Sequence, residues 1–260
     1  MNLGLQGKLA LVSGASRGIG RACAEELARE GADVVLVARD GAALAEVRGA
    51  IEKIGRRTTT LACDLREPTA AAMAVQAALG AFGRIDILVH SAGATKRGDF
   101  FDLTDADFDD GFALKFMGAV RLAREAWPHL VKAKGTVVNI IGAGGRNASP
   151  DFTIGGPVNA ALMNFTKAMA LRGIKDGVRV AGINPGAIET DRLRRRVAVR
   201  MAADGSSEEE ARRTMLADLG IARFGRPEDI GKLVCYLAGN AADFLQGTLV
   251  DIDGGENHGI

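Results

Sequence analysis

The stretch that decides the fold is Ser13-Gly14-Ala15-Ser16-Arg17-Gly18-Ile19-Gly20, which joins an apolar run to a helical pattern. Gly14 permits a tight turn, Gly18 lets the backbone come close to a pyrophosphate, and Gly20 allows the helix to lie against the strand. The first amides of such a helix lack backbone partners and carry partial positive charge, which attracts phosphate groups. The stretch therefore predicts a strand–turn–helix unit that binds a dinucleotide.

Short apolar runs alternate with longer helical patterns along the rest of the chain. The runs are nearly continuous, which is typical of parallel strands covered on both faces. The expected strands are Lys8–Ser13, Asp33–Ala38, Thr58–Cys63, Ile85–His90, Thr136–Ile141, Arg179–Ile183 and Thr248–Ile252. The expected helices are Ile19–Glu30, Gly41–Ile54, Thr69–Phe82, Ala106–Ala133, Asn159–Lys175 and Glu228–Gly239. This alternation predicts a three-layer, doubly wound α/β Rossmann fold with a seven-stranded parallel sheet in the order 3-2-1-4-5-6-7.

Composition narrows the class of protein. The chain has 260 residues, of which 47% are hydrophobic and 25% charged, so we expect a single domain over 1–260 with a sizeable core. A net charge of +1 argues against a nucleic-acid surface, and the sequence shows neither a membrane span nor a signal peptide. Scattered cysteines and histidines predict a cytoplasmic protein without disulfides or a metal site.

The segment Asp191–Gly225 interrupts the alternation of strands and helices with a polar helical insertion between the last two strands. An insertion at this edge of such a sheet usually covers the ligand crevice, so we expect a lid on the substrate side. Its start is rich in arginine: Arg192, Arg194, Arg195, Arg196 and Arg200. Two interpretations stay open, because these side chains can contact an anion or form a solvated helix face.

The end of the second expected strand, Val37-Ala38-Arg39-Asp40, favours NADP(H) over NAD(H). Proteins that bind NAD usually place a carboxylate here for the ribose 2′-hydroxyl, and Ala38 stands at that position. Arg39 and Arg17 can instead clamp a 2′-phosphate. The register at this strand end stays open by one residue, and Asp40 is the alternative residue for the role expected in an NAD-binding protein.

Over its whole length the chain resembles the short-chain dehydrogenase/reductase family. The glycine stretch is similar to the family's TGxxxGIG motif, Cys63-Asp64-Leu65 to its adenine-contacting motif, and His90-Ser91-Ala92-Gly93 to its NNAG turn. His90 is expected to support that turn by hydrogen bonding. Later similarities are Asn184–Thr190, which is like the family's PGxxxT segment, then Gly225–Ile230 and Asp253–Gly255.

The resemblance implies an NADP(H)-binding protein that acts on a small molecule and assembles as a homotetramer or homodimer on its two long central helices. It also implies a set of cofactor-binding residues. These are Gly14, Ser16, Arg17, Gly18, Ile19, Gly20, Arg39, Asp64, Leu65, Ser91, Ala92, Gly93, Pro185, Gly186, Ile188 and Thr190.

The four catalytic residues of the family fall on other residue types. The spacing places the family's Ser at Gly142, its Tyr at Gly155 and its Lys at Asn159. Its Asn falls on Lys115, or on Leu114 if the register shifts by one residue. The chain has a single tyrosine, Tyr236, and no lysine follows it four residues later. The resemblance therefore predicts an atypical member without the Asn-Ser-Tyr-Lys tetrad.

Three functions stay open. In the first, an oxidoreductase transfers a hydride to or from a small organic substrate, with Lys115 and Asn159 converging as the catalytic groups. Gly142 and Gly155 would then leave room for a bulkier substrate. In the second, the scaffold carries a non-redox elimination, isomerisation or cyclisation. Its candidate residues also include Lys96, Arg97, Arg146, Asn147, Ser149, Asp151 and Glu189. In the third, the chain is a catalytically inactive NADP-binding protein.

Overall fold

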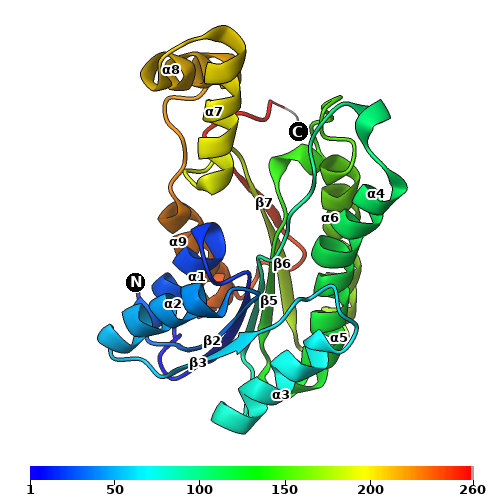
Figure 1. Ribbon diagram of the computed structural model, residues 1–260. Helices are drawn as coiled ribbons and strands as arrows, with labels where there is room; N and C mark the ends of the chain where they lie inside the picture. The colour runs from blue at the N-terminus through cyan, green and yellow to red at the C-terminus, as the bar shows by residue number, and fades with distance from the viewer. Residues whose placement is uncertain (259–260) are drawn as a thin grey trace.

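A parallel sheet forms the centre of the computed structural model, which describes residues 1–258. Its seven strands have the order β3-β2-β1-β4-β5-β6-β7, so the predicted order is confirmed (Figure 1). The last two residues of the expected domain 1–260 lie outside the described part. The strands are β1 (Leu9–Ser13), β2 (Asp33–Ala38), β3 (Thr58–Ala62), β4 (Ile87–His90), β5 (Thr136–Ile140), β6 (Arg179–Pro185) and β7 (Leu249–Ile252).

Helices cover both faces of the sheet, which explains why the central strands are apolar throughout (Figure 1). One face carries α1 (Gly18–Arg29), α2 (Gly41–Lys53) and α9 (Pro227–Ala238). The other carries α3 (Ala70–Phe82), α5 (Gly118–Ala133) and α6 (Gly155–Asp176). Alternate residues of each strand therefore enter one core or the other: Val34 and Leu36 face α1 and α2, whereas Val35 and Val37 face α3.

The stretch predicted as one helix, Ala106–Ala133, is helical throughout, but a π-helical turn that the sequence did not predict divides it. The chain forms α4 (Asp105–Gly111), then a π-helical turn η2 (Phe112–Met117), and only then α5. A π-turn holds one residue more than an α-turn, and such turns often occur at functional sites. Here the wider turn buries Leu114 and Lys115 together, so the interruption brings a lysine into the interior.

Helix α6 begins at Gly155, four residues before the expected start at Asn159. The sequence Gly155-Gly156-Pro157 suggests a turn, but a proline in the first turn of a helix loses no hydrogen bond. The amide of Val158 donates to the carbonyl of Ile154 at 3.1 Å, so helical hydrogen bonding begins before the proline. Asn159 consequently lies within the helix instead of at its start.

The insertion is a helical hairpin of α7 (Asp191–Asp204) and α8 (Glu208–Leu219), which Figure 1 shows at one end of the molecule. Gly205 ends α7 at φ +71°, and Ser207 caps α8 in a reciprocal arrangement with Glu210. The hairpin has an apolar cluster of its own: Ala187, Leu193, Val197, Ala211, Met215, Ile221 and Phe224. Because this cluster holds α7 and α8 together, their polar faces are left for other contacts.

Candidate functional site

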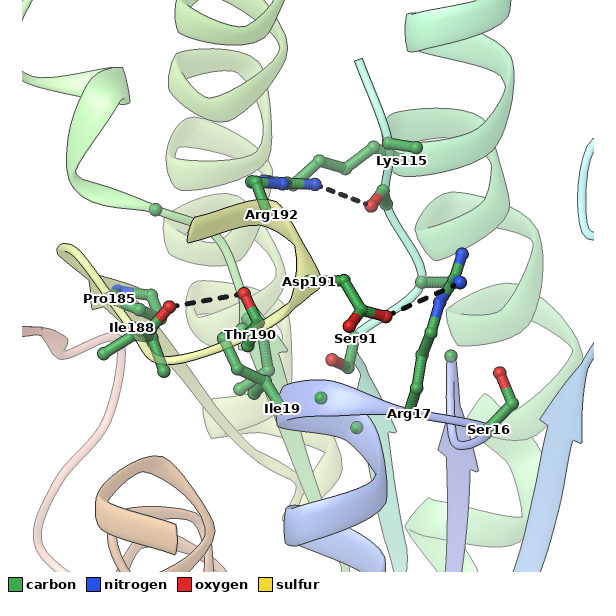
Figure 2. A pocket seen from close by; sticks show the side chains of 18 of the residues that line it. Ser16, Arg17, Ile19, Ser91, Lys115, Pro185, Ile188, Thr190, Asp191 and Arg192 are labelled. Atoms are coloured by element: carbon green, nitrogen blue, oxygen red, sulfur yellow. Dashed lines mark hydrogen bonds and ion pairs between the residues drawn. The ribbon is translucent and has the colours of Figure 1, made fainter. Parts of the chain in front are cut away.

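A cavity of about 640 Å³ opens where β1, β4, β5 and β6 end. All the residues predicted to bind the cofactor line it except Asp64. Figure 2 shows Ser16 and Arg17 at one end of the pocket, and Lys115 and Arg192 at the other. The topology accounts for this gathering, because the carboxyl ends of neighbouring parallel strands share one edge of the sheet.

The glycine loop has the geometry that a pyrophosphate requires. Gly14 has φ +67°, and a Cβ there would lie 2.8 Å from the amide nitrogen of Ala92. At Gly20 a Cβ would lie 2.2 Å from the carbonyl oxygen of Gly14. No side chain caps the start of α1, so its first amides have no side-chain acceptor. Since these amides line the cavity, the loop fits the phosphates of a dinucleotide.

Two arginines line the cavity next to the glycine loop. The side chains of Arg17 and Arg39 are 70% and 59% exposed, and both line the cavity. Arg39 Nη1 lies 3.7 Å from Asp64 Oδ2, which places Asp64 behind the cavity wall. Asp40 caps α2 by accepting the amide of Ala43 at 3.0 Å. Its carboxylate thus already has a structural role at the helix start.

Lys115 and Asn159 meet inside the site. Lys115 Nζ donates to Asn159 Oδ1 at 2.5 Å and to the backbone carbonyl of Ile141. Lys115 is only 8% exposed, yet it lines the cavity; Asn159 lies behind it. Burial, and then repulsion from Arg192, lowers the pKa of Lys115 to about 7. Both protonation states are therefore populated near neutral pH.

A hydrogen-bond chain links the glycine loop to Lys115. The hydroxyl of Ser13 accepts the amides of Ser91 and Ala92 at 3.1 and 3.2 Å. Its own hydrogen is then directed to His90 Nδ1 at 3.1 Å. His90 Nε2 in turn donates to the backbone carbonyl of Lys115 at 3.0 Å. Burial, aided by the charge of Lys115, lowers the pKa of His90 to about 4 against the opposing hydrogen bond.

The expected open space at Gly155 is absent. A Cβ at Gly155 would lie 2.0 Å from the ring of Phe152, so that ring fills the space instead. The guanidinium of Arg97 stacks on the same ring, 4.1 Å from its centre. At Gly142 a Cβ would lie 3.0 Å from Asn159 Nδ2. Sequence reasoning missed Phe152; the signal was an aromatic residue one helical turn before a helix-starting glycine.

Other candidate groups are engaged elsewhere. Lys96 binds Asp107 at 2.9 Å, Glu189 binds Arg212, and none of these four lines the cavity. Among residues 1–258, no group of three or more His, Cys, Asp or Glu side chains could hold a metal ion. In the same part of the chain, no helix has the length and apolar character needed to cross a membrane.

The fold and the phosphate-binding loop define a dinucleotide-binding α/β protein. Residues 14–257 match the family model described as enoyl-(acyl carrier protein) reductase. An uncharacterized oxidoreductase of Mycobacterium tuberculosis is 35% identical over 96% of this chain and 92% of its own length. The chain belongs to the short-chain dehydrogenase/reductase family, whose members are NAD(P)-dependent oxidoreductases.

Solved structures agree with this assignment. L-Sorbose reductase from Gluconobacter frateurii, in complex with NADPH and L-sorbose, matches with a TM-score of 0.95 at 32% identity, covering all of both chains. A short-chain dehydrogenase from Burkholderia cenocepacia, in complex with NADP, matches with a TM-score of 0.86 at 31% identity, covering 97% of this chain and 99% of that one.

The His90 network predicts a pH dependence of stability. The folded-state pKa of about 4 lies below the unfolded value near 6.5, so only the unfolded state takes up a proton between them. The free energy of unfolding should therefore fall as the pH is lowered through this window, by about 3 kcal/mol in all. His90→Asn keeps an acceptor and a donor but cannot titrate, so it should flatten this part of the profile.

Urea unfolding at several pH values between about 4 and 7 measures this difference. His129→Asn is the control, because His129 takes no part in the network. Parallel profiles for the wild type and His90→Asn would refute the assignment of the pH dependence to His90.

Proposed function

We propose that this chain is an NADP(H)-dependent oxidoreductase in which Lys115 exchanges the proton that accompanies hydride transfer to or from a small organic substrate. The observation that carries the proposal is the buried Lys115 ammonium on the cavity wall, held by Asn159 and Ile141 with a pKa of about 7. A catalytic acid or base works best when its pKa lies near the operating pH.

The residues at the family's catalytic positions support Lys115, instead of a serine or tyrosine, as the source of the proton. Gly142 and Gly155 have no hydroxyl to donate, and Tyr236 lies on α9 with 37% exposure. The cofactor supplies or accepts the hydride when it is bound. An ammonium has three N–H groups, and two of them meet the acceptors of Asn159 and Ile141. The third is left for a substrate oxygen, whose developing negative charge it would neutralise.

The proposed preference for NADP(H) rests on the charges at the adenosine end. Arg17 and Arg39 line this end, and no carboxylate stands at Ala38. Asp40 is engaged as the cap of α2. Guanidinium groups bind phosphate through paired, charge-assisted hydrogen bonds, so this end suits a 2′-phosphate. The structures of L-sorbose reductase with NADPH and of the Burkholderia enzyme with NADP lend further support.

Lys115→Met should abolish turnover and leave NADPH binding intact. Methionine keeps much of the buried volume and removes the transferable proton. Wild-type kcat/KM, measured by NADPH absorbance with a panel of ketones, aldehydes, enones and imines, should titrate with an apparent pKa of about 7. Lys132→Met, at an exposed position of α5, is the matched control. Activity in Lys115→Met with an unchanged pH profile would refute the role of Lys115.

Arg39→Gln should weaken NADPH binding and spare NADH. Loss of a charge-assisted hydrogen bond of about 1.5–3 kcal/mol corresponds to roughly tenfold to hundredfold in Kd. Fluorescence titration with both cofactors measures the ratio. Arg48→Gln, on the exposed side of α2 in an ion pair with Glu52, controls for the lost charge. Equal weakening of NADPH and NADH would contradict the assignment of Arg39 to the 2′-phosphate.

We also propose a homodimer or homotetramer built on α5 and α6. The outer face of α6 exposes Leu171 by 69% and Ile174 by 67%, which favours a buried contact there. The double variant Leu171→Glu/Ile174→Glu should sediment as a smaller species than the wild type. Val199→Glu, 70% exposed on α7, should not change the sedimentation coefficient. A wild type that sediments as a monomer would refute the assembly.

A further inference from the structure

Arginines gather on the side of the cavity opposite the glycine loop. Arg192, Arg195 and Arg196 project from the first turns of α7 and line the cavity. Arg97 belongs to the loop after β4 and repels both Arg192 and Arg196, so it lies within electrostatic reach of them. We call these four residues the arginine wall. Lys115 adds a fifth cationic group, since Arg192 is close enough to depress its pKa.

Too few carboxylates face the arginine wall to neutralise it. Asp151 binds Arg97 at 2.6 Å and also attracts Arg196, so one carboxylate is shared between two guanidiniums. Glu256 attracts Arg196, but its carboxylate also accepts the amide of Ala187 at 3.1 Å. Asp191, at the start of α7, is taken by Arg194 and Arg17.

Within residues 1–258, Arg192 and Arg195 form no ion pair at all. Arg192 donates to the carbonyl of Gly93 at 3.2 Å, which is a neutral acceptor. Desolvation first, and then repulsion from Arg195, Arg97 and Arg196, lowers the pKa of Arg192. Arg192, Arg195 and Arg196 are solvent-exposed, so an anion can reach all three. Guanidiniums that repel one another are stabilised when an anion enters between them.

The position of the wall separates it from the phosphate sites of the cofactor. The phosphate-binding features begin with Arg17 at the start of α1, which lies at the other end of the pocket from Arg192 (Figure 2). Arg39 follows the end of β2 and lines the same cavity. Arg97 instead stacks on Phe152, whose ring covers Gly155 next to the Lys115–Asn159 pair. An anion at the arginine wall would therefore lie beside the proposed proton donor.

We propose that the arginine wall binds an anionic group of the substrate, a carboxylate or a phosphate, and holds the reacting carbon near Lys115. The proposal rests on the proposed function, because it names the substrate class of the same site. Neutral ketones and alcohols would then be poor substrates, and keto or hydroxy acids and phosphorylated carbonyl compounds good ones.

The test is a binding measurement on the NADPH-loaded protein at low ionic strength. Isothermal titration with succinate, with inorganic phosphate and with succinamide compares two anions with an uncharged analogue of succinate. Succinate or phosphate should bind, and succinamide should not. Arg195→Gln/Arg196→Gln should weaken anion binding by about tenfold or more and leave the Kd for NADPH unchanged. Arg213→Gln, exposed on α8, is the control for lost charge on the same hairpin.

Each alternative outcome overturns the proposal. No heat with either anion, equal binding of succinamide, or equal weakening by Arg213→Gln would mean that the wall is not an anion site. If the double variant weakens NADPH as much as the anions, the arginines serve the phosphates of the cofactor. A thermal unfolding midpoint equal to that of the wild type verifies that the double variant is folded.

The binding test does not depend on turnover, so it separates this proposal from that for Lys115. Anion binding that depends on Arg195 and Arg196, in a protein inert towards every carbonyl compound, would support the wall and refute the oxidoreductase. Turnover that depends on Lys115, with anion binding that is unchanged in the arginine variant, would support the oxidoreductase and refute the arginine wall as an anion site.

Discussion

The burial of the Lys115 ammonium is the constraint on which the site depends. A charge removed from water costs several kcal/mol unless hydrogen bonds and polar neighbours compensate for it. Here the compensation comes from two other elements, the carbonyl of Ile141 after β5 and the amide oxygen of Asn159 in α6. Neither partner carries a negative charge, so the ammonium is solvated but not neutralised, and its pKa stays low.

His90 extends this constraint to the cofactor loop. It holds the backbone carbonyl of Lys115 within the π-turn, and the hydroxyl of Ser13 orients its other nitrogen. Ser13 and His90 stand side by side because β1 and β4 pair in parallel register at these two residues. The strand order therefore places the glycine loop, the imidazole and the lysine in one hydrogen-bonded series.

Sequence reasoning succeeded where a residue's position follows from chain periodicity. The sheet order follows from the βα alternation, and the glycine loop from its context between a strand and a helix. It failed where tertiary packing decides. The π-turn has no local signature, since Phe112 and Phe116 fit α-helical periodicity equally well. Phe152 fills the place over Gly155, and its spacing before that glycine is only a weak signal for a contact that tertiary packing decides.

The pairing of Lys115 with Asn159 follows partly from the sequence and partly from tertiary packing. Motif spacing placed both residues in the site, but the π-turn in which the buried Lys115 lies was not predicted from the sequence. Burial is the main cause of the low pKa of Lys115, and repulsion from Arg192, on the hairpin that carries the arginine wall, lowers it further. An anion bound at the wall would offset part of that repulsion and raise the pKa of Lys115, so in the proposed site substrate charge and proton donation would be coupled.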